Sequence, residues 1–204
     1  KQEVDAVRST VGLLEIANFS KHEFTGPDAR KFLDFILAGK IPKQGRISLN
    51  PMLTKKGKLY GDLTVACLNE ERFMIFGSGA VQEMHRRWFE SHLPDIGVIY
   101  KNRSDDYHGL AISGPNSREL MSKISREDVS NESFKFRDIK EIFVGGVPAI
   151  VNRISFTGEL GYEIYTAPQF QIKLFEEIEK NGKNLGLKIF GGRALMSMRL
   201  EKNW

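Results

Sequence analysis

The sequence has almost no cysteine and no long apolar run, and each absence excludes a class of protein. Cys67 is the only cysteine among 204 residues, so neither an internal disulfide nor a cysteine-rich zinc site can form. It lies in the apolar run LTVACL, which is typical of a buried thiol rather than a nucleophile. No stretch reaches the roughly eighteen apolar residues that a membrane-spanning helix needs, and the first ten residues lack a secretory-signal pattern. We therefore expect a soluble, cytoplasmic protein with no membrane contact.

Charge of one sign is not concentrated anywhere in the chain. Lysine and arginine number 30 against 26 aspartate and glutamate, which gives a net charge of +4. This small excess favours anionic small molecules, whereas a nucleic-acid surface requires clustered basic residues, and no block of five occurs. We expect no nucleic-acid partner.

Motifs for dinucleotides and metals are also missing. The segment GSGA at 77–80 lacks the third glycine of a dinucleotide-binding loop, and we expect no flavin to be bound by this chain. The four histidines show no H-x-x-x-H spacing, so no metal site is predicted. His85 and His92 lie seven residues apart in QEMHRRWFESHLP, and we expect them on a solvated helix face.

Hydrophobic periodicity and turn residues predict an α+β fold with antiparallel sheets. The predicted strands are 11–17, 20–25, 47–53, 58–68, 71–77, 97–103, 107–113, 139–145, 147–156 and 160–166. The predicted helices are 27–38, 79–92, 115–124, 168–182 and 191–202. Short polar or glycine-containing turns join several strand pairs, which is typical of hairpins and argues against a doubly wound parallel sheet.

One internal similarity is present. FTGPDARKFLDFI at 24–36 resembles ISGPNSRELMSKI at 112–124. In both, a glycine allows a sharp corner after a strand, and Pro27 or Pro115 suits the first turn of a helix. True duplication and two similar strand-to-helix turns explain the pattern equally well.

Two stretches place an acid in a strand, where aspartate and glutamate are unfavourable. In PMLTKKGKLYGDLTVA, Asp62 shares one face with Tyr60 and Thr64, while Leu59, Leu63 and Val65 belong to the less polar side. An exposed residue of an edge strand explains Asp62 as well as a functional role does. Local conflicts of this kind occur at functional sites.

The second stretch is FTGELGYEI, which sets two glutamates around two glycines. Glu159 lies at the tip of a glycine turn and is expected to be solvated, with a role only in shaping the turn. Glu163 re-enters a strand, where a fixed carboxylate accepts two parallel hydrogen bonds from a planar donor pair.

A third stretch, FGGRALMSMRLEKNW, has two arginines in a predicted helix. Arg193 near the helix start opposes the helix dipole, whereas Arg199 lies further along. An anionic ligand and an internal salt bridge explain these arginines equally well.

Six runs together resemble the folate-binding aminomethyltransferase family, which includes the glycine-cleavage T-protein and, more closely, the folate domains of dimethylglycine and sarcosine dehydrogenases. They are GLLEIANFSKHEFTGPDA, PMLTKKGKLYGDLTVA, FGSGAVQEMHRRWF, ISGPNSREL, FTGELGYEIY and FGGRALMSMRLEK, in the family's order. They cover essentially all of residues 1–204. The resemblance implies an antiparallel Greek-key domain and a ferredoxin-like domain, interleaved around a channel for tetrahydrofolate.

The resemblance also implies roles for particular residues. Asp62 in GDLTV corresponds to the family's catalytic acid beside the folate nitrogens, and Glu163 corresponds to the glutamate that binds the pterin. Phe156 stands where the family often has tyrosine, so stacking is retained without the phenolic hydrogen bond. The remaining channel-lining candidates are Tyr60, Tyr162 and Arg199.

The chain departs from the family in one respect, because nothing here corresponds to the C-terminal β-barrel that follows the LEK motif. The expected activity is formation of 5,10-methylenetetrahydrofolate from an aminomethyl or methylated-glycine donor. The alternative is a non-catalytic folate-binding or assembly module. A separate chain or domain carrying flavin or lipoyl and the barrel is the expected macromolecular partner.

Overall fold

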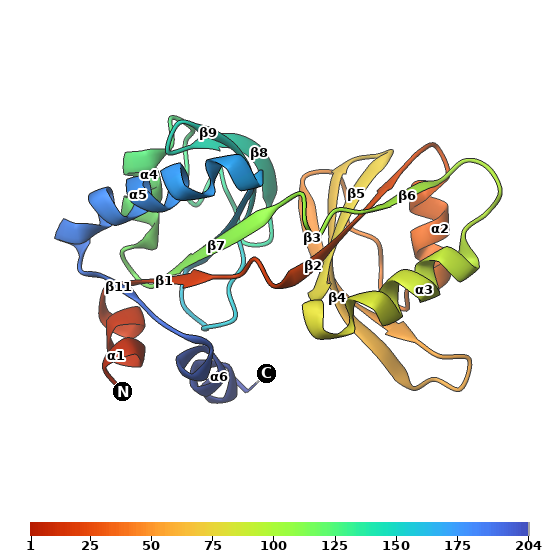
Figure 1. The fold of residues 1–204 in the computed structure, drawn as a ribbon, viewed down its shortest axis with the longest axis horizontal. Helices are drawn as coiled ribbons and strands as arrows, with labels where there is room; N and C mark the ends of the chain where they lie inside the picture. The colour runs from red at the N-terminus through yellow and green to blue at the C-terminus, as the bar shows by residue number, and fades with distance from the viewer. Residues whose placement is uncertain (204) are drawn as a thin grey trace. The chain divides into compact units, whose positions relative to one another are not determined.

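The computed structural model describes residues 1–203 and confirms the α+β fold class, with two sheets (Figure 1). The chain forms two compact units. Unit 1 consists of residues 1–17 together with the chain from His108 onward, and unit 2 consists of residues 18–107. None of the helices within residues 1–203 has the length and apolar character needed to span a membrane.

Nearly all predicted elements are present. Unit 1 contains α1 (Gln2–Ser9), β1 (Val11–Glu15), β7 (His108–Ser113), α4 (Ser117–Ile124), β8 (Ile139–Val144), β9 (Val147–Asn152), β10 (Gly161–Thr166), α5 (Gln171–Gly182), β11 (Leu187–Ile189) and α6 (Gly192–Glu201). Unit 2 contains β2 (Phe19–Thr25), α2 (Ala29–Ile36), β3 (Arg46–Leu53), β4 (Leu59–Asn69), β5 (Arg72–Ser78), α3 (Gln82–His92) and β6 (Ile99–Asn102). The sequence did not predict α1, which buries only Val7, or the three-residue strand β11.

The two sheets repeat one strand order. In unit 2 the order is β3-β4-β5-β2-β6, and in unit 1 it is β8-β9-β10-β7-β1-β11. Along the chain, both series read strand, helix, three strands, helix and strand, beginning at β2 and at β7. The difference lies beyond the repeated four strands, where β1 takes the place of β6 and pairs in parallel with β11. This shared topology favours duplication as the origin of the similar segments at 24–36 and 112–124.

A glycine corner joins the central strand of each sheet to its helix. Gly26 and Gly114 adopt φ values of 122° and 133°, which side-chain-bearing residues rarely reach. A Cβ at Gly114 would lie 2.5 Å from the carbonyl oxygen of Thr10, and one at Gly26 would overlap the carbonyl oxygen of Gly97. The prolines that follow lie in the turn just before helices α2 and α4, rather than inside their first turn.

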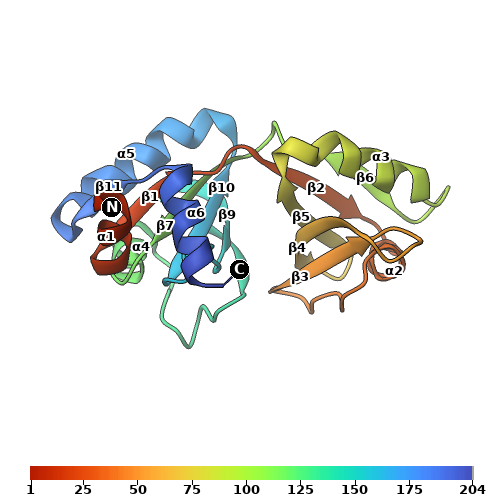
Figure 2. The same cartoon turned by 90° about the horizontal axis from the view of Figure 1, so that it is seen from below.

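Each unit has its own hydrophobic core. In unit 1, helices α4 and α5 cover one face of the sheet, and the core between them includes Leu120, Ile164 and Leu174. Helices α1 and α6 lie on the opposite face, where Val7, Phe190 and Met198 are buried together (Figures 1 and 2). In unit 2, one core unites α2 and α3 with the sheet. Functional side chains are therefore sought on the sheet faces that these cores do not occupy.

The glycine corner generates a stability prediction. We expect Gly114→Ala to lower the free energy of unfolding by about 3 kcal/mol, because the methyl group meets backbone atoms at a positive φ. Gly57→Ala is the control, since Gly57 has a φ of 72° but no atom within 4 Å of the added Cβ. Its cost is about 1–2 kcal/mol from backbone strain alone. Equal losses in urea unfolding would show that the close backbone contact is unimportant.

Candidate functional site

Glu163 lies in the middle of β10 and is buried, with 4% of its surface exposed. Strand β10 pairs with β7 on one side and β9 on the other, and all six of its residues are buried. The hydroxyl of Tyr165 donates a hydrogen bond of 3.0 Å to Oε2 of Glu163. The two side chains share a face because residues two apart in a strand point the same way.

The burial of Glu163 changes its acidity. Desolvation raises the pKa of Glu163 to about 7, and the hydrogen bond from Tyr165 offsets part of this rise. A carboxyl group of this kind gains or loses a proton near neutral pH. Groups with such shifted pKa values are concentrated at functional sites.

Asn152 lies directly opposite Glu163 in the register of β9 and β10. It is fully buried, and both Nδ2 and Oδ1 lack a hydrogen-bond partner among residues 1–203. Buried polar groups are nearly always bonded, so an orphaned amide beside a buried carboxylate suggests a place for a polar ligand. Sequence reasoning missed Asn152, because only the strand register brings it beside Glu163.

Tyr162 lies on the other face of β10 from Glu163. Its ring is fully buried in the core of unit 1, at 5.7 Å from the ring of Phe134. Its hydroxyl donates to the carbonyl oxygen of Val129 at 3.5 Å. The structure thus places Tyr162 in the hydrophobic core instead of on the Glu163 face, because successive residues of a strand alternate between faces.

Phe156 and Arg199 also belong to unit 1. Phe156 is half-buried in the loop after β9, and Nζ of Lys202 lies 5.9 Å from the centre of its ring. Arg199 lies on α6, and its Nε is buried without a hydrogen-bond partner in the described part of the chain. Arg199 therefore retains a donor for a ligand, and no salt bridge explains it.

Glu159 does more than shape its turn. Nη1 of Arg8 donates to Oε1 of Glu159 at 2.7 Å and to the carbonyl oxygen of Thr157 at 2.9 Å. Nη2 of the same arginine pairs with Glu201 on α6 at 2.7 Å. The expectation of a solvated residue was wrong, because a partner almost 150 residues away in the sequence lies beside the turn. Glu159 is therefore a structural ion-pair residue.

Asp62 belongs to unit 2 and lies on β4, opposite Pro51 of the edge strand β3. Its side chain is exposed, and none of residues 1–203 forms a hydrogen bond or salt bridge with it. Leu63 and Val65 are buried in the core of unit 2 on the opposite face, as the alternation predicted. The carboxylate of Asp62 is consequently available for interaction with a ligand.

Tyr60 marks an irregularity in β4. Met52 pairs with Gly61 while Leu53 pairs with Leu59, so Tyr60 is the extra residue of a β-bulge. The bulge reverses the alternation, which is why Leu59 is 66% exposed although the sequence placed it on the less polar side. Tyr60 is partly buried, with its ring 4.7 Å from that of Trp88. A bulge two residues before Asp62 alters the direction of the strand beside the candidate acid.

His85 is the second correction in unit 2. The residue is 1% exposed, and a Cβ at Gly61 would lie 2.9 Å from its Nε2. Its ring packs near His22 and Phe89 at centroid distances of 6.5 Å. The prediction of a solvated face was wrong because this face of α3 packs against the sheet. Burial lowers the pKa of His85.

Lys21 is a buried cation that sequence reasoning missed. Thr64 pairs with Phe76, and Phe76 pairs with Lys21, so Lys21 shares a sheet face with Thr64 and Asp62. Its side chain is fully buried, and Nζ donates to the carbonyl oxygen of Ser104 at 3.5 Å. Alternating polarity in FSKHEFT was the only available signal.

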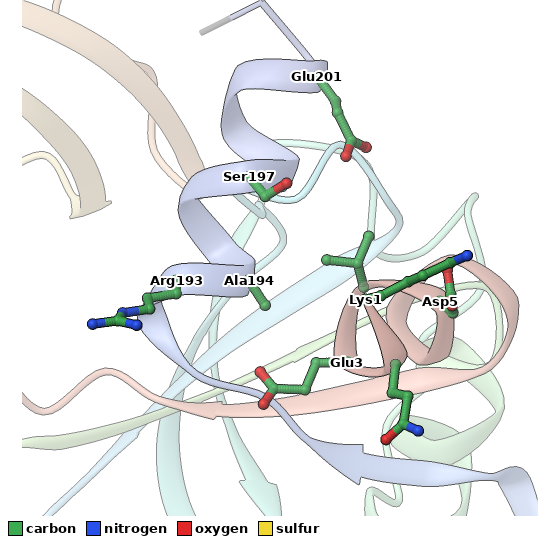
Figure 3. Close-up of a pocket in the computed structure, with 9 residues that line it drawn as sticks. Lys1, Glu3, Asp5, Arg193, Ala194, Ser197 and Glu201 are labelled. Atoms are coloured by element: carbon green, nitrogen blue, oxygen red, sulfur yellow. The ribbon is translucent and has the colours of Figure 1, made fainter.

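A pocket of about 720 Å³ between α1 and α6 contains none of the predicted residues (Figure 3). Its polar groups connect the two helices. Oε2 of Glu3 accepts a hydrogen bond of 2.8 Å from the backbone nitrogen of Gly191, and Glu201 pairs with Arg8. We assign this pocket to the packing of the terminal helices.

The raised pKa of Glu163 predicts how stability depends on pH. The unfolded chain loses this proton near its ordinary pKa of 4.5, whereas the folded protein keeps it until about 7. Stability is therefore lost as pH rises through this window, by about 3 kcal/mol. Glu163→Gln should remove this loss, so the stability of the wild type relative to the variant should fall. Urea unfolding between these pH values tests this, and parallel profiles would contradict it.

Comparisons with known proteins identify the family. The model of the GCVT N-terminal domain matches residues 1–204. Mitochondrial dimethylglycine dehydrogenase of Homo sapiens is 34% identical over 203 residues, covering 98% of this chain and 23% of that protein. An aminomethyltransferase of Halothermothrix orenii is 29% identical over 205 residues, covering 100% of this chain and 57% of that protein.

Solved structures show the same fold. Glycine cleavage system aminomethyltransferase T from Bartonella henselae superposes with a TM-score of 0.88 at 21% identity, over 100% of this chain and 54% of that one. A heterotetrameric sarcosine oxidase from Corynebacterium gives a TM-score of 0.69 at 14% identity, over 90% of this chain and 91% of that one. The chain spans about half the length of the aminomethyltransferases that it matches. It belongs to the folate-binding aminomethyltransferase family defined by the GCVT N-terminal domain.

Proposed function

We propose that this chain is a tetrahydrofolate-dependent aminomethyltransferase domain. It transfers a one-carbon unit from a glycine-derived or N-methylglycine-derived donor and yields 5,10-methylenetetrahydrofolate. Membership of a folate-binding family supports the acceptor, and similarity to proteins named aminomethyltransferase and dimethylglycine dehydrogenase supports the two donor classes.

The observation that carries the proposal is the buried acid on β10. A pterin presents an amide and an amine side by side, which is a planar pair of donors that suits one carboxylate. Glu163 fits this edge, because Tyr165 holds its carboxylate in place and the orphaned amide of Asn152 lies opposite. Arg199 retains a buried donor on the same unit, and Phe156 offers an aromatic ring.

On unit 2, we assign to Asp62 the role that the family motif gives it. When bound, tetrahydrofolate supplies the nitrogens that accept the one-carbon unit. The donor carbon is positively charged during transfer, and a fixed carboxylate stabilises this charge and accepts a proton. Asp62 is exposed and not engaged by residues 1–203, so its charge is available. Tyr60 at the adjacent bulge is its neighbour in the strand.

A further chain or domain is part of this proposal. The donor carbon must reach this domain from an oxidised methylamine or from a carrier-bound aminomethyl group. Similarity to a heterotetrameric sarcosine oxidase supports a flavin-containing partner, and similarity to aminomethyltransferases supports a lipoyl carrier.

Binding of tetrahydrofolate tests the role of Glu163. We expect Glu163→Gln to weaken binding by roughly ten- to a hundredfold, because one charge-assisted acceptor is lost. Glu132→Gln, at an exposed position of unit 1, is the matched control and should bind like the wild type.

The pH dependence of binding gives a second measurement on the same proteins. The carboxylate form binds the donors, so wild-type affinity should rise as pH passes through about 7, with release of a proton. Glu163→Gln should lack this dependence. Calorimetry in buffers of different ionisation enthalpy measures both quantities, and pH-independent wild-type binding would argue against contact with Glu163.

Turnover tests Asp62. We expect Asp62→Asn to keep most of the folate affinity but to lose at least about a hundredfold in the rate of methylenetetrahydrofolate formation, as expected for an essential acid–base group. Asp34→Asn, on the exposed side of α2, serves as the control. An unchanged rate would remove Asp62 from the reaction. Folate binding without measurable turnover in the wild type would favour a binding or assembly module.

A further inference from the structure

A second pocket of unit 1 lies beside the loop that follows β9. It has a volume of about 340 Å³. It is lined by Phe136, Arg153, Ile154, Ser155, Gly158, Glu159, Leu160, Gly161 and Lys202. Neither Glu163 nor Asn152 is among these residues, so the pocket does not depend on the folate proposal.

Arg153 is the unusual residue of this pocket. It is only 7% exposed, and both Nε and Nη1 are buried without a hydrogen-bond partner among residues 1–203. A buried guanidinium without a partner is strongly unfavourable, because its charge has lost water and gained nothing in return. The native structure thus holds a cation whose natural counter-ion is an external anion.

The backbone keeps Arg153 in place. Its nitrogen donates to the carbonyl oxygen of Asp138 at 2.9 Å, and its own carbonyl oxygen accepts from the nitrogen of Arg137 at 2.9 Å. Main-chain bonds on both sides fix the direction from which the side chain enters the pocket. The guanidinium is therefore positioned before any ligand arrives, which reduces the entropy lost on binding.

The other charges of the pocket leave it positive. The carboxylate of Glu159 is already paired with Arg8 at 2.7 Å. Nζ of Lys202 donates to the carbonyl oxygen of Ser155 at 3.0 Å, and an ammonium group has two further donors. Burial lowers the pKa of Lys202, so an anion beside it would stabilise its charged form. An anion entering the pocket meets two cations and one neutralised carboxylate.

The apolar part of the lining indicates which anion fits. Phe136, Ile154 and Leu160 contribute hydrocarbon surface next to the charged groups. An arginine matches the two oxygens of a carboxylate with two parallel N–H donors. The hydrocarbon surface would contact the organic part of such a molecule, whereas a free inorganic anion would gain nothing from it.

We propose that this pocket binds the carboxylate of an organic molecule, with Arg153 as its two-pronged donor and Lys202 as the second cation. The carboxylate belongs either to a free small molecule or to an acidic side chain of a polypeptide. The site is separate from the pterin-binding role of Glu163, and it stands or falls independently of that role.

Benzoate is the first probe, with benzamide as its neutral counterpart of the same shape. We expect the wild-type chain to bind benzoate at least tenfold more tightly than benzamide in calorimetric titrations. The Nε–Hε resonance of Arg153 should shift in nuclear magnetic resonance spectra on addition of benzoate. This readout needs no substitution in the protein. An unshifted resonance at saturating benzoate would overturn the proposal.

Two variants locate the binding. Arg153→Met should abolish benzoate binding, and Arg153→Lys should weaken it at least tenfold, because a single ammonium cannot replace the paired donors. Arg126→Gln makes the same charge change as Arg153→Met at an exposed position of unit 1 and should leave binding unchanged. Equal loss in all three variants would reduce the effect to net charge and refute a specific site.

Thermal stability separates a binding arginine from a structural one. Without ligand, Arg153→Met should raise the melting temperature or leave it unchanged, because the variant removes an uncompensated buried charge. A clear fall in the melting temperature would identify Arg153 as a structural residue and contradict the proposal.

The final comparison distinguishes the source of the carboxylate. A capped peptide with one glutamate, titrated beside benzoate, represents an acidic side chain. Tighter binding of benzoate supports a free small molecule, and tighter binding of the peptide supports a polypeptide partner. Binding of inorganic phosphate in preference to both would overturn the assignment to a carboxylate.

Discussion

The glycine corner after the central strand is the constraint on which both sheets depend. At Gly26 and Gly114 the backbone turns at a positive φ and passes against another carbonyl group. A side chain cannot occupy that space, so the helix that follows is directed onto its own sheet. Each helix then contributes to the core that fixes which face of the sheet is filled. The candidate residues Glu163 and Asp62 are on faces that these helices leave available.

Strand β10 illustrates how a core and a polar site share one element. Tyr162 and Ile164 pack into the core of unit 1, while Glu163 and Tyr165 point to the other face. Both faces are buried, which desolvates the carboxylate and raises its pKa. The strand therefore pays for a functional acid with stability at neutral pH, a conflict typical of functional sites.

Most of the fold could be predicted from the sequence, because hydrophobic period and turn residues are local signals. The five predicted helices and ten predicted strands correspond to observed elements, whereas α1 and β11 are short and have weak patterns. The site was less accessible to sequence reasoning. Glu163 stood out as an acid in a strand, but Asn152 and Arg153 depend on strand pairing and on missing partners in space. Glu159 and His85 were misjudged for the same reason, since long-range contacts determine their burial.

Unit 2 is inserted into unit 1, and this order has a consequence for synthesis on the ribosome. Every strand of the unit 2 sheet lies within residues 18–107, so this unit can fold as soon as that segment has emerged. Strand β1 is made first but pairs with β7 and β11, which come about a hundred and more residues later. The N-terminal strand must therefore wait without partners while unit 2 forms, and unit 1 closes only near the end of translation.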